Sequence, residues 1–203
     1  TKIAFLREGE IWTMDANGEN RKKLSDTEGA IEGYKFSPDG KKVILLKSLD
    51  YHGTIKKNPS DLPLATGRLV TDMNYRHWDH YVEQISHAFV ADVTENGIAN
   101  VVDILEGEPY ECPLAPFGGI EQLDWSIDSK LVAYTCRKKE GVDYAISTDA
   151  DIYIYNVETK HTRNLCKPEG YKEPKIDATK SMKNQAVNHQ QGDMNVGYDV
   201  NPK

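Results

Sequence analysis

The chain has 203 residues with a formal net charge of −7, and 38% of its residues are hydrophobic and 28% charged. The acidic balance argues against a nucleic-acid or anionic-membrane surface, because both need clustered Lys and Arg to replace counterions. No apolar run approaches the roughly 18 residues of a membrane span, so no membrane span is predicted.

Strand patterns dominate the chain from its start. Residues 3–6 form a short apolar run, and residues 10–15 (EIWTMD) resemble a second strand. Residues 16–19 (ANGE) predict a turn between this strand and the next. No segment shows sustained 3.6-residue periodicity, and the best helix candidate, residues 79–86, fits a strand equally well.

The stretch at residues 34–46 (YKFSPDGKKVILL) predicts two strands joined by a tight turn. We assign Ser37, Pro38, Asp39 and Gly40 to that turn. The proline fixes φ, the aspartate can bond its own backbone, and the glycine takes the left-handed conformation that reverses the chain.

The same turn pattern returns later in the chain. Residues 124–132 (DWSIDSKLV) match residues 35–43 (KFSPDGKKV), so Ser126 and Asp128 are predicted to shape a second copy of the turn. A serine replaces the glycine there. A third copy is predicted to begin at residues 197–202 (GYDVNP).

A second pattern repeats in step with the turn. It consists of a strand with an aromatic residue at its second position and Asp or Asn at its fifth, followed by a turn and another strand. The three copies begin at Ile11, Ala88 and Ile152. A small antiparallel sheet cannot bury both faces alone, so repeated sheets must stack on their neighbours.

We therefore predict an all-β fold: a partial β-propeller of about three four-stranded antiparallel blades with two long insertions. One incomplete propeller domain is predicted over residues 1–203. Loops as long as the insertions are typically functional or mobile. The approximate boundaries are 1–48, 87–136 and 150–203 for the repeats, and 49–86 and 169–195 for the insertions.

These repeats resemble the propeller repeats of TolB and of the prolyl oligopeptidase family of serine peptidases. The segment YRHWD at residues 75–79, with Arg76, Trp78 and Asp79, is followed by HAFVAD at residues 87–92. This combination is similar to the start of a second blade in acylaminoacyl-peptidase and dipeptidyl-peptidase relatives. The resemblance implies a non-catalytic propeller that admits short peptides to a downstream α/β-hydrolase domain, which these residues do not include.

The sequence contains no pattern for a catalytic nucleophile. No serine has the Gly-x-Ser-x-Gly flanking that a nucleophile elbow requires, and Ser37 is assigned to a turn. The adjacent Glu-Glu pair with which related dipeptidyl peptidases often hold a substrate's amino terminus does not occur either. Catalytic residues are therefore predicted to lie outside this chain, and the cleavage preference stays open.

No metal or cofactor site is predicted. His77, His80 and His87 lie near Asp79, but no carboxylate or cysteine set completes four ligands at a recognised spacing. We expect Trp78 to pack between blades instead. Arg76 is then expected to form an ion pair with Asp79.

The three cysteines also lack the spacing of a zinc site or a disulfide framework. No two of them form a CxxC pair, so free or buried thiols are predicted, with one bridge left open. They are Cys112, Cys136 and Cys166.

Two functional hypotheses follow. In the first, the chain is a propeller fragment of a serine exopeptidase, with the hydrolase domain and peptide substrates as partners and homo-oligomerisation left open. In the second, it is a TolB-like protein-interaction module of the cell envelope. We expect a periplasmic or exported protein, with the cytoplasm as the alternative.

Overall fold

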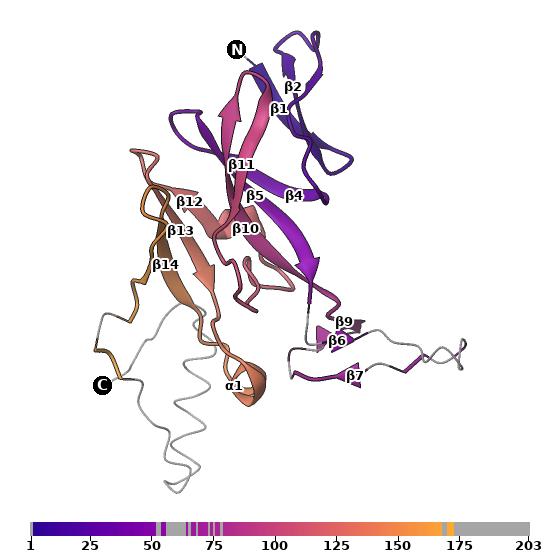
Figure 1. Cartoon of the computed structure of the whole chain (residues 1–203), viewed down its shortest axis with the longest axis vertical. Coiled ribbons are helices and arrows are strands. Elements are labelled where there is room, and N and C mark those ends of the chain that lie inside the picture. The colour runs from indigo at the N-terminus through magenta and orange to yellow at the C-terminus, as the bar shows by residue number, and fades with distance from the viewer. Residues whose placement is uncertain are drawn as a thin grey trace, which may run out of the picture.

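The computed structural model describes residues 2–51, 54–55, 64, 66–67, 69–72, 74, 76–77, 79–167 and 170–172. Within these residues the protein is all-β, with antiparallel sheets and one short α-helix (Figure 1). No described helix is long and apolar enough to span a membrane. The elements of the three main sheets are β1 (Lys2–Arg7), β2 (Glu10–Asp15), β3 (Lys22–Lys23), β4 (Ile31–Phe36), β5 (Lys42–Asp50), β10 (Gln84–Thr94), β11 (Gly97–Asp103), β12 (Leu123–Trp125), β13 (Leu131–Cys136), β14 (Asp151–Asn156) and β15 (Thr162–Asn164).

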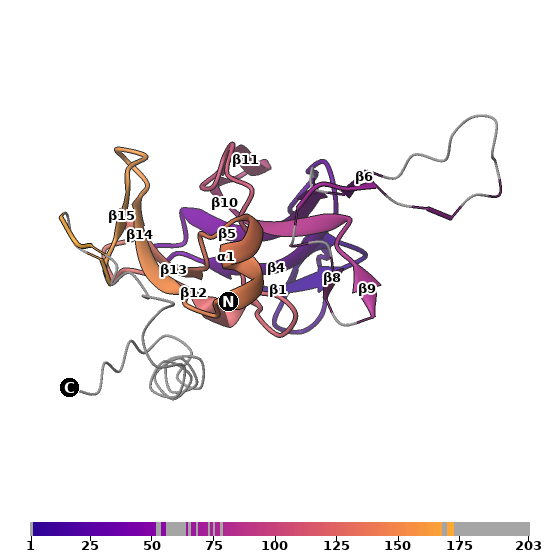
Figure 2. The same ribbon diagram turned by 90° about the horizontal axis from the view of Figure 1, so that it is seen from below.

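The strands form three main sheets that pack on one another in chain order. The first sheet has the order β1-β2-β3, the second β11-β10-β5-β4, and the third β12-β13-β14-β15. Two small hairpins lie between β5 and β10 in the chain: β6 (Thr54–Ile55) with β7 (Leu69–Val70), and β8 (Arg76–His77) with β9 (His80–Tyr81). Figure 2 shows the three sheets and the two hairpins from below.

The second sheet is buried on both faces because its central strands supply two different cores. On β5, Val43 and Leu45 pack with Ile11 of the first sheet, whereas Ile44 and Leu46 pack with residues of the third sheet. Successive side chains of a strand point to opposite faces, so the uninterrupted apolar run of β5 serves both neighbours. The stacking of sheets expected from the repeats is thus present in this part of the chain.

Backbone contacts join the first sheet to the second. The N–H of Ile98 donates to the carbonyl of Leu24 over 3.0 Å, and the N–H of Ile31 donates to that of Gly9 over 2.8 Å. Gly97 adopts a φ of +135°, and a Cβ at this position would lie 2.6 Å from the Leu24 carbonyl oxygen. Glycine therefore permits the close approach of the two sheets.

The third sheet is tied to the second through β4. The indole Nε1–H of Trp125 donates to the carbonyl of Lys35 over 3.0 Å, and Lys35 Nζ donates back to the carbonyl of Leu123 over 2.6 Å. Trp125 is buried in the same apolar cluster as Tyr134 and Tyr153, whose rings stack at 5.4 Å. These contacts fix the position of one sheet on the next.

Several sequence expectations can be compared with these elements. The helix candidate at residues 79–86 contains β9 and the start of β10, so the strand alternative is correct there. The actual helix, α1 (Gly141–Ile146), was not predicted, because six residues are too few to show helical periodicity. The third turn copy at residues 197–202 lies outside the described residues.

The sheets are offset from the expected repeats. Residues 1–48 contain the whole first sheet together with β4 and all of β5 except its last two residues. The sequence repeat therefore ends with the first hairpin of the following sheet. The connection between β5 and β10 spans residues 51–83.

Candidate functional site

The first predicted turn lies between β4 and β5, and its polar groups bond one another. The N–H of Gly40 donates to the Ser37 carbonyl over 2.9 Å, and the Ser37 hydroxyl donates to Asp39 Oδ1 over 2.7 Å. Gly40 has a φ of +71°. The hydrogen bonds from Ser37 and from the Lys41 N–H lower the pKa of Asp39. Ser37 is buried, and together with Pro38 these residues form a structural turn.

The second predicted turn, between β12 and β13, has the same geometry. The Ser126 hydroxyl donates to Asp128 Oδ1 over 2.6 Å, and the Ser129 N–H donates to the Ser126 carbonyl over 2.9 Å. Ser129 has a φ of +61°, so a serine adopts the conformation that the glycine has in the first turn. Its hydroxyl accepts the N–H of Asp39 over 3.2 Å and links the two turns.

The Arg-x-Trp-Asp segment lies in and beside the β8–β9 hairpin. The guanidinium of Arg76 lies 5.5 Å from the centroid of the Tyr81 ring, and Asp79 Oδ1 lies 3.2 Å from His80 Nε2. Trp78 lies outside the described residues. Arg76 and Asp79 are both exposed at this hairpin.

A buried carboxylate that was not predicted from the sequence as a site residue contacts this hairpin. Glu111, in the connection from β11 to the 3₁₀-helix η1 (Ile120–Gln122), is only 3% exposed. Its Oε2 lies 3.0 Å from His77 Nε2, and its Oε1 accepts the Tyr144 hydroxyl over 2.6 Å. The Arg137 Nη2 lies 3.8 Å from the same oxygen. Three separate segments therefore meet at one carboxylate.

Arg137 and Tyr144 come from the connection between β13 and β14, which contains α1. The guanidinium carbon of Arg137 lies 3.9 Å from the centroid of the Tyr144 ring, and its Nη1 donates to the Ser147 carbonyl over 3.1 Å. The Arg137 Nε is buried without a hydrogen-bond partner. Burial and the charge of Glu111 raise the pKa of Tyr144, so its hydroxyl stays protonated and acts as a donor.

These groups border a cavity of about 680 Å³. Arg76 and His77 line it from the β8–β9 hairpin, and Arg137, Tyr144 and Ala145 line it from the β13–β14 connection. Residues 114–118 (LAPFG) supply an apolar wall. Figure 1 shows α1 and β9 at the same end of the molecule. The cavity is large enough for a small ligand, and its lining includes no serine or cysteine among the residues that the structure describes.

This site was not predicted from the sequence. His77, Glu111, Arg137 and Tyr144 lie far apart in the chain and at no recognised motif spacing. They meet because connections of the second and third sheets end on the same side. Arg76 was predicted as part of the blade-entry segment and His77 was considered as a metal ligand; both line the cavity, a role that the sequence did not suggest for either.

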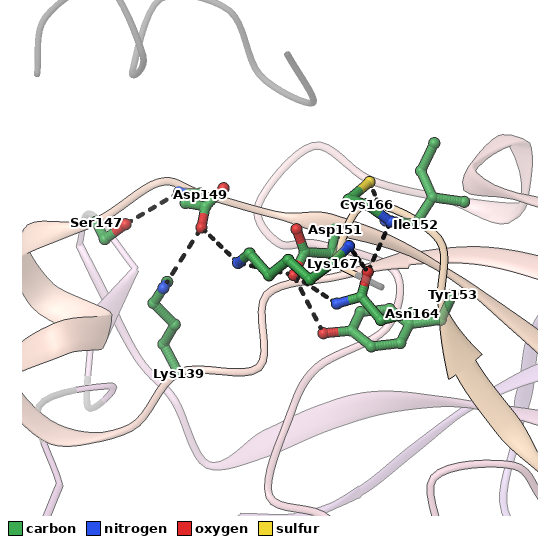
Figure 3. Close-up of polar contacts among 9 residues, drawn as sticks. All are labelled: Lys139, Ser147, Asp149, Asp151, Ile152, Tyr153, Asn164, Cys166 and Lys167. Atoms are coloured by element: carbon green, nitrogen blue, oxygen red, sulfur yellow. Dashed lines mark hydrogen bonds and ion pairs between the residues drawn. The ribbon is translucent and has the colours of Figure 1, made fainter. Parts of the chain in front are cut away.

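A second polar cluster joins the start of β14 to the chain after β15 (Figure 3). Lys167 Nζ lies 2.9 Å from Asp149 Oδ2 and 2.9 Å from Asp151 Oδ2, and Asn164 donates to Asp151 over 2.8 Å. Burial raises the pKa of Asp149, but Lys167 and Lys139 outweigh it and the net shift is downward. The Lys167 ammonium thus bridges both carboxylates, and the Lys139 ammonium lies 3.5 Å from Asp149 Oδ2, so two cations balance the two anions in a structural cluster.

Metal and thiol chemistry find little support in the described part of the chain. No group of three or more His, Cys, Asp or Glu residues there could hold a metal ion. All three cysteines are free, with Cys112 and Cys136 buried and Cys166 exposed. Burial raises the pKa of Cys112, and it raises that of Cys136 to about 12, so both stay thiols.

The sequence matches no protein-family model. It is 47% identical to dipeptidyl-peptidase 5 of Porphyromonas gingivalis over 137 residues, which are 68% of this chain. It is 36% identical to dipeptidyl-peptidase 5 of Porphyromonas endodontalis over 168 residues, which are 81% of this chain. The chain is homologous to a segment of dipeptidyl-peptidase 5. The resemblance to dipeptidyl-peptidase relatives predicted from the sequence is confirmed.

The matched segment is a minor part of each relative. The chain spans 20% of the length of the P. gingivalis protein and 24% of that of the P. endodontalis protein. Among solved structures, TolB from Acinetobacter baumannii is similar over 81% of this chain and 30% of its own, with 14% identity and a TM-score of 0.39. At that score the likeness does not define the fold.

Proposed function

We propose that the chain is a non-catalytic part of a β-propeller in a serine-type dipeptidyl-peptidase. In this proposal the propeller controls which peptides reach a hydrolase domain in the same protein. The observation that carries it is the 47% identity with dipeptidyl-peptidase 5 of P. gingivalis over 137 residues.

The packing of the sheets supports a propeller. Antiparallel sheets of three or four strands stack face to face, and the second sheet is buried on both sides. Such stacking is what blades require, since no single blade buries both of its faces. We propose that the second and third sheets are complete blades and that the first sheet belongs to another.

A non-catalytic role agrees with the composition of the chain. No Gly-x-Ser-x-Gly motif occurs in the sequence, and a hydrolase nucleophile needs that strained turn. The serine hydroxyl of each repeated turn donates a hydrogen bond to the aspartate of the same turn, Ser37 to Asp39 and Ser126 to Asp128. In this proposal the catalytic serine comes from the hydrolase domain.

The test is peptide cleavage by the whole protein. We expect the whole protein to release dipeptides from the amino terminus of short peptides and to be inhibited by a serine-reactive phosphonate. A folded protein with the same amino-terminal residues as these peptides should not be cleaved. Rates should fall as peptides lengthen, because a propeller restricts access by size. A protein that releases no dipeptide and instead retains a partner protein would favour the TolB-like interaction module.

We further propose that the protein works in the periplasm or outside the cell. Fractionation of the native organism followed by detection of the protein tests this proposal. Recovery with cytoplasmic markers would contradict it.

A further inference from the structure

We propose that the cavity beside Glu111 is a subsite for the carboxylate group of a short peptide. Arg137 would receive the carboxylate, and residues 114–117 (LAPF) would contact an apolar side chain next to it. The ligand class rests on the proposed function, which this inference deepens by naming the group recognised.

The charges around the cavity favour an anion. Its lining includes two arginines, Arg76 and Arg137, together with His77, and it includes no Asp or Glu among the described residues. The nearest carboxylate, Glu111, is 3% exposed and already accepts hydrogen bonds from Tyr144 and His77. Glu111 is not among the residues that line the cavity, so the charged side chains that its described lining presents to a ligand are guanidinium groups, which attract anions.

Arg137 is held in place for such a role. Its guanidinium stacks on the Tyr144 ring at 3.9 Å and is fixed at one end by the Ser147 carbonyl. Its Nε is buried without an acceptor, and its side chain as a whole is 16% exposed. A guanidinium held in one orientation at the wall of the cavity is suited to a carboxylate, because arginine N–H groups match the geometry of carboxylate oxygens.

The size and the wall of the cavity suit a peptide end. About 680 Å³ falls within the range of roughly 300–1,000 Å³ that small-ligand sites occupy. The wall formed by Leu114, Ala115, Pro116 and Phe117 is apolar, and Phe117 is 78% exposed. An exposed aromatic ring beside an arginine offers apolar contact and charge to the same short ligand.

The carboxylate can come from two sources: the carboxyl terminus of a peptide or an acidic side chain. Calorimetric titration of the whole protein with amino-blocked probes, which a dipeptidyl-peptidase cannot cleave, distinguishes them. N-acetyl-Leu-Ala is compared with its carboxyl-terminal amide, and N-acetyl-Asp-Leu-amide with N-acetyl-Asn-Leu-amide. We expect the acid of one pair to bind at least about tenfold more tightly than its neutral partner, because it forms charge-assisted hydrogen bonds.

Three variants locate the binding. Arg137→Gln should abolish the preference for the acid and leave the affinity for the neutral probe unchanged. Phe117→Ala changes an exposed side chain and should weaken both members of a pair alike. Arg163→Gln is the matched control, because Arg163 is an exposed residue of β15 outside the cavity, and it should behave like the wild type. If Arg137→Gln fails to fold, Arg76→Gln, an exposed position, should still reduce the preference.

Equal binding of acid and neutral probes by the wild type would overturn the subsite, and so would an acid preference that survives in both arginine variants. Dipeptide release without any acid preference would refute the subsite and leave the proposed function standing. Acid preference in a protein that releases no dipeptide would refute the function and leave the subsite standing.

Discussion

The Glu111 carboxylate should stabilise the protein more than any surface carboxylate does, because it is buried and shared by three segments. Tyr144→Phe keeps the ring under Arg137 and removes only the hydroxyl that donates to Glu111 over 2.6 Å. A hydrogen bond to a charged group contributes about 1.5–3 kcal/mol, so we expect a loss of that size. Glu111→Gln also removes the anion facing the buried guanidinium and should cost about 3–5 kcal/mol.

Equilibrium unfolding in urea, followed by tryptophan fluorescence, measures both losses. Glu158→Gln is the matched control: it makes the same chemical change at a side chain that is 63% exposed and 3.4 Å from Lys130. An exposed pair of this kind contributes about 0–1 kcal/mol. The reasoning is refuted if Glu111→Gln costs no more than Glu158→Gln, or if Tyr144→Phe costs more than Glu111→Gln.

Three further predictions concern other parts of the structure. Ser129→Ala should lower the free energy of unfolding by about 1 kcal/mol, because it removes the hydrogen bond between the two turns. Ser129→Gly should cost less in the same urea titration, since glycine relieves the positive φ; equal losses would contradict this account. The lowered pKa of Asp149 means that its pairing with Lys167 stabilises the fold above the unfolded pKa of 3.8 and is lost as the pH falls through the folded value. The stability difference between wild type and Asp149→Asn should therefore shrink below pH 3.8, and a constant difference would count against the pairing. Iodoacetamide should label exposed Cys166 and spare buried Cys112 until urea is added, as peptide mass spectrometry would show.

The repeated turns could be predicted from sequence because their chemistry is local. Ser37, Asp39 and Gly40 bond within four consecutive residues, so the residue types alone specify the turn. Ser129 replaces the glycine in the second copy, and its φ of +61° is close to the +71° of Gly40. The side chain of Ser129 bonds to the other turn, a contact between residues 90 positions apart that sequence alone does not reveal.

The candidate site could not be predicted because its chemistry is not local. Glu111 and Tyr144 are 33 positions apart, and Glu111 and His77 are 34 apart. No periodicity links them, since Glu111 lies in a loop, His77 in the two-residue strand β8, and Tyr144 in the short helix α1. The short helix that carries Tyr144 spans only Gly141–Ile146 and also lacks a side-chain cap. Sequence reasoning finds repeated strands and turns, whereas this site depends on how the sheets stack.

The topology explains why the cavity lies where it does. In an antiparallel sheet, the turn before a strand and the connection after it lie at opposite ends of that strand. The turns before β5 and β13 are short, and their serine and aspartate side chains are engaged within them. The connections after β5 and β13 are long and meet at the other end, where they bring together Arg76, His77, Arg137 and Tyr144. Substitutions in the turns should therefore change stability alone, whereas a substitution at the cavity, such as Arg137→Gln, should also change ligand recognition.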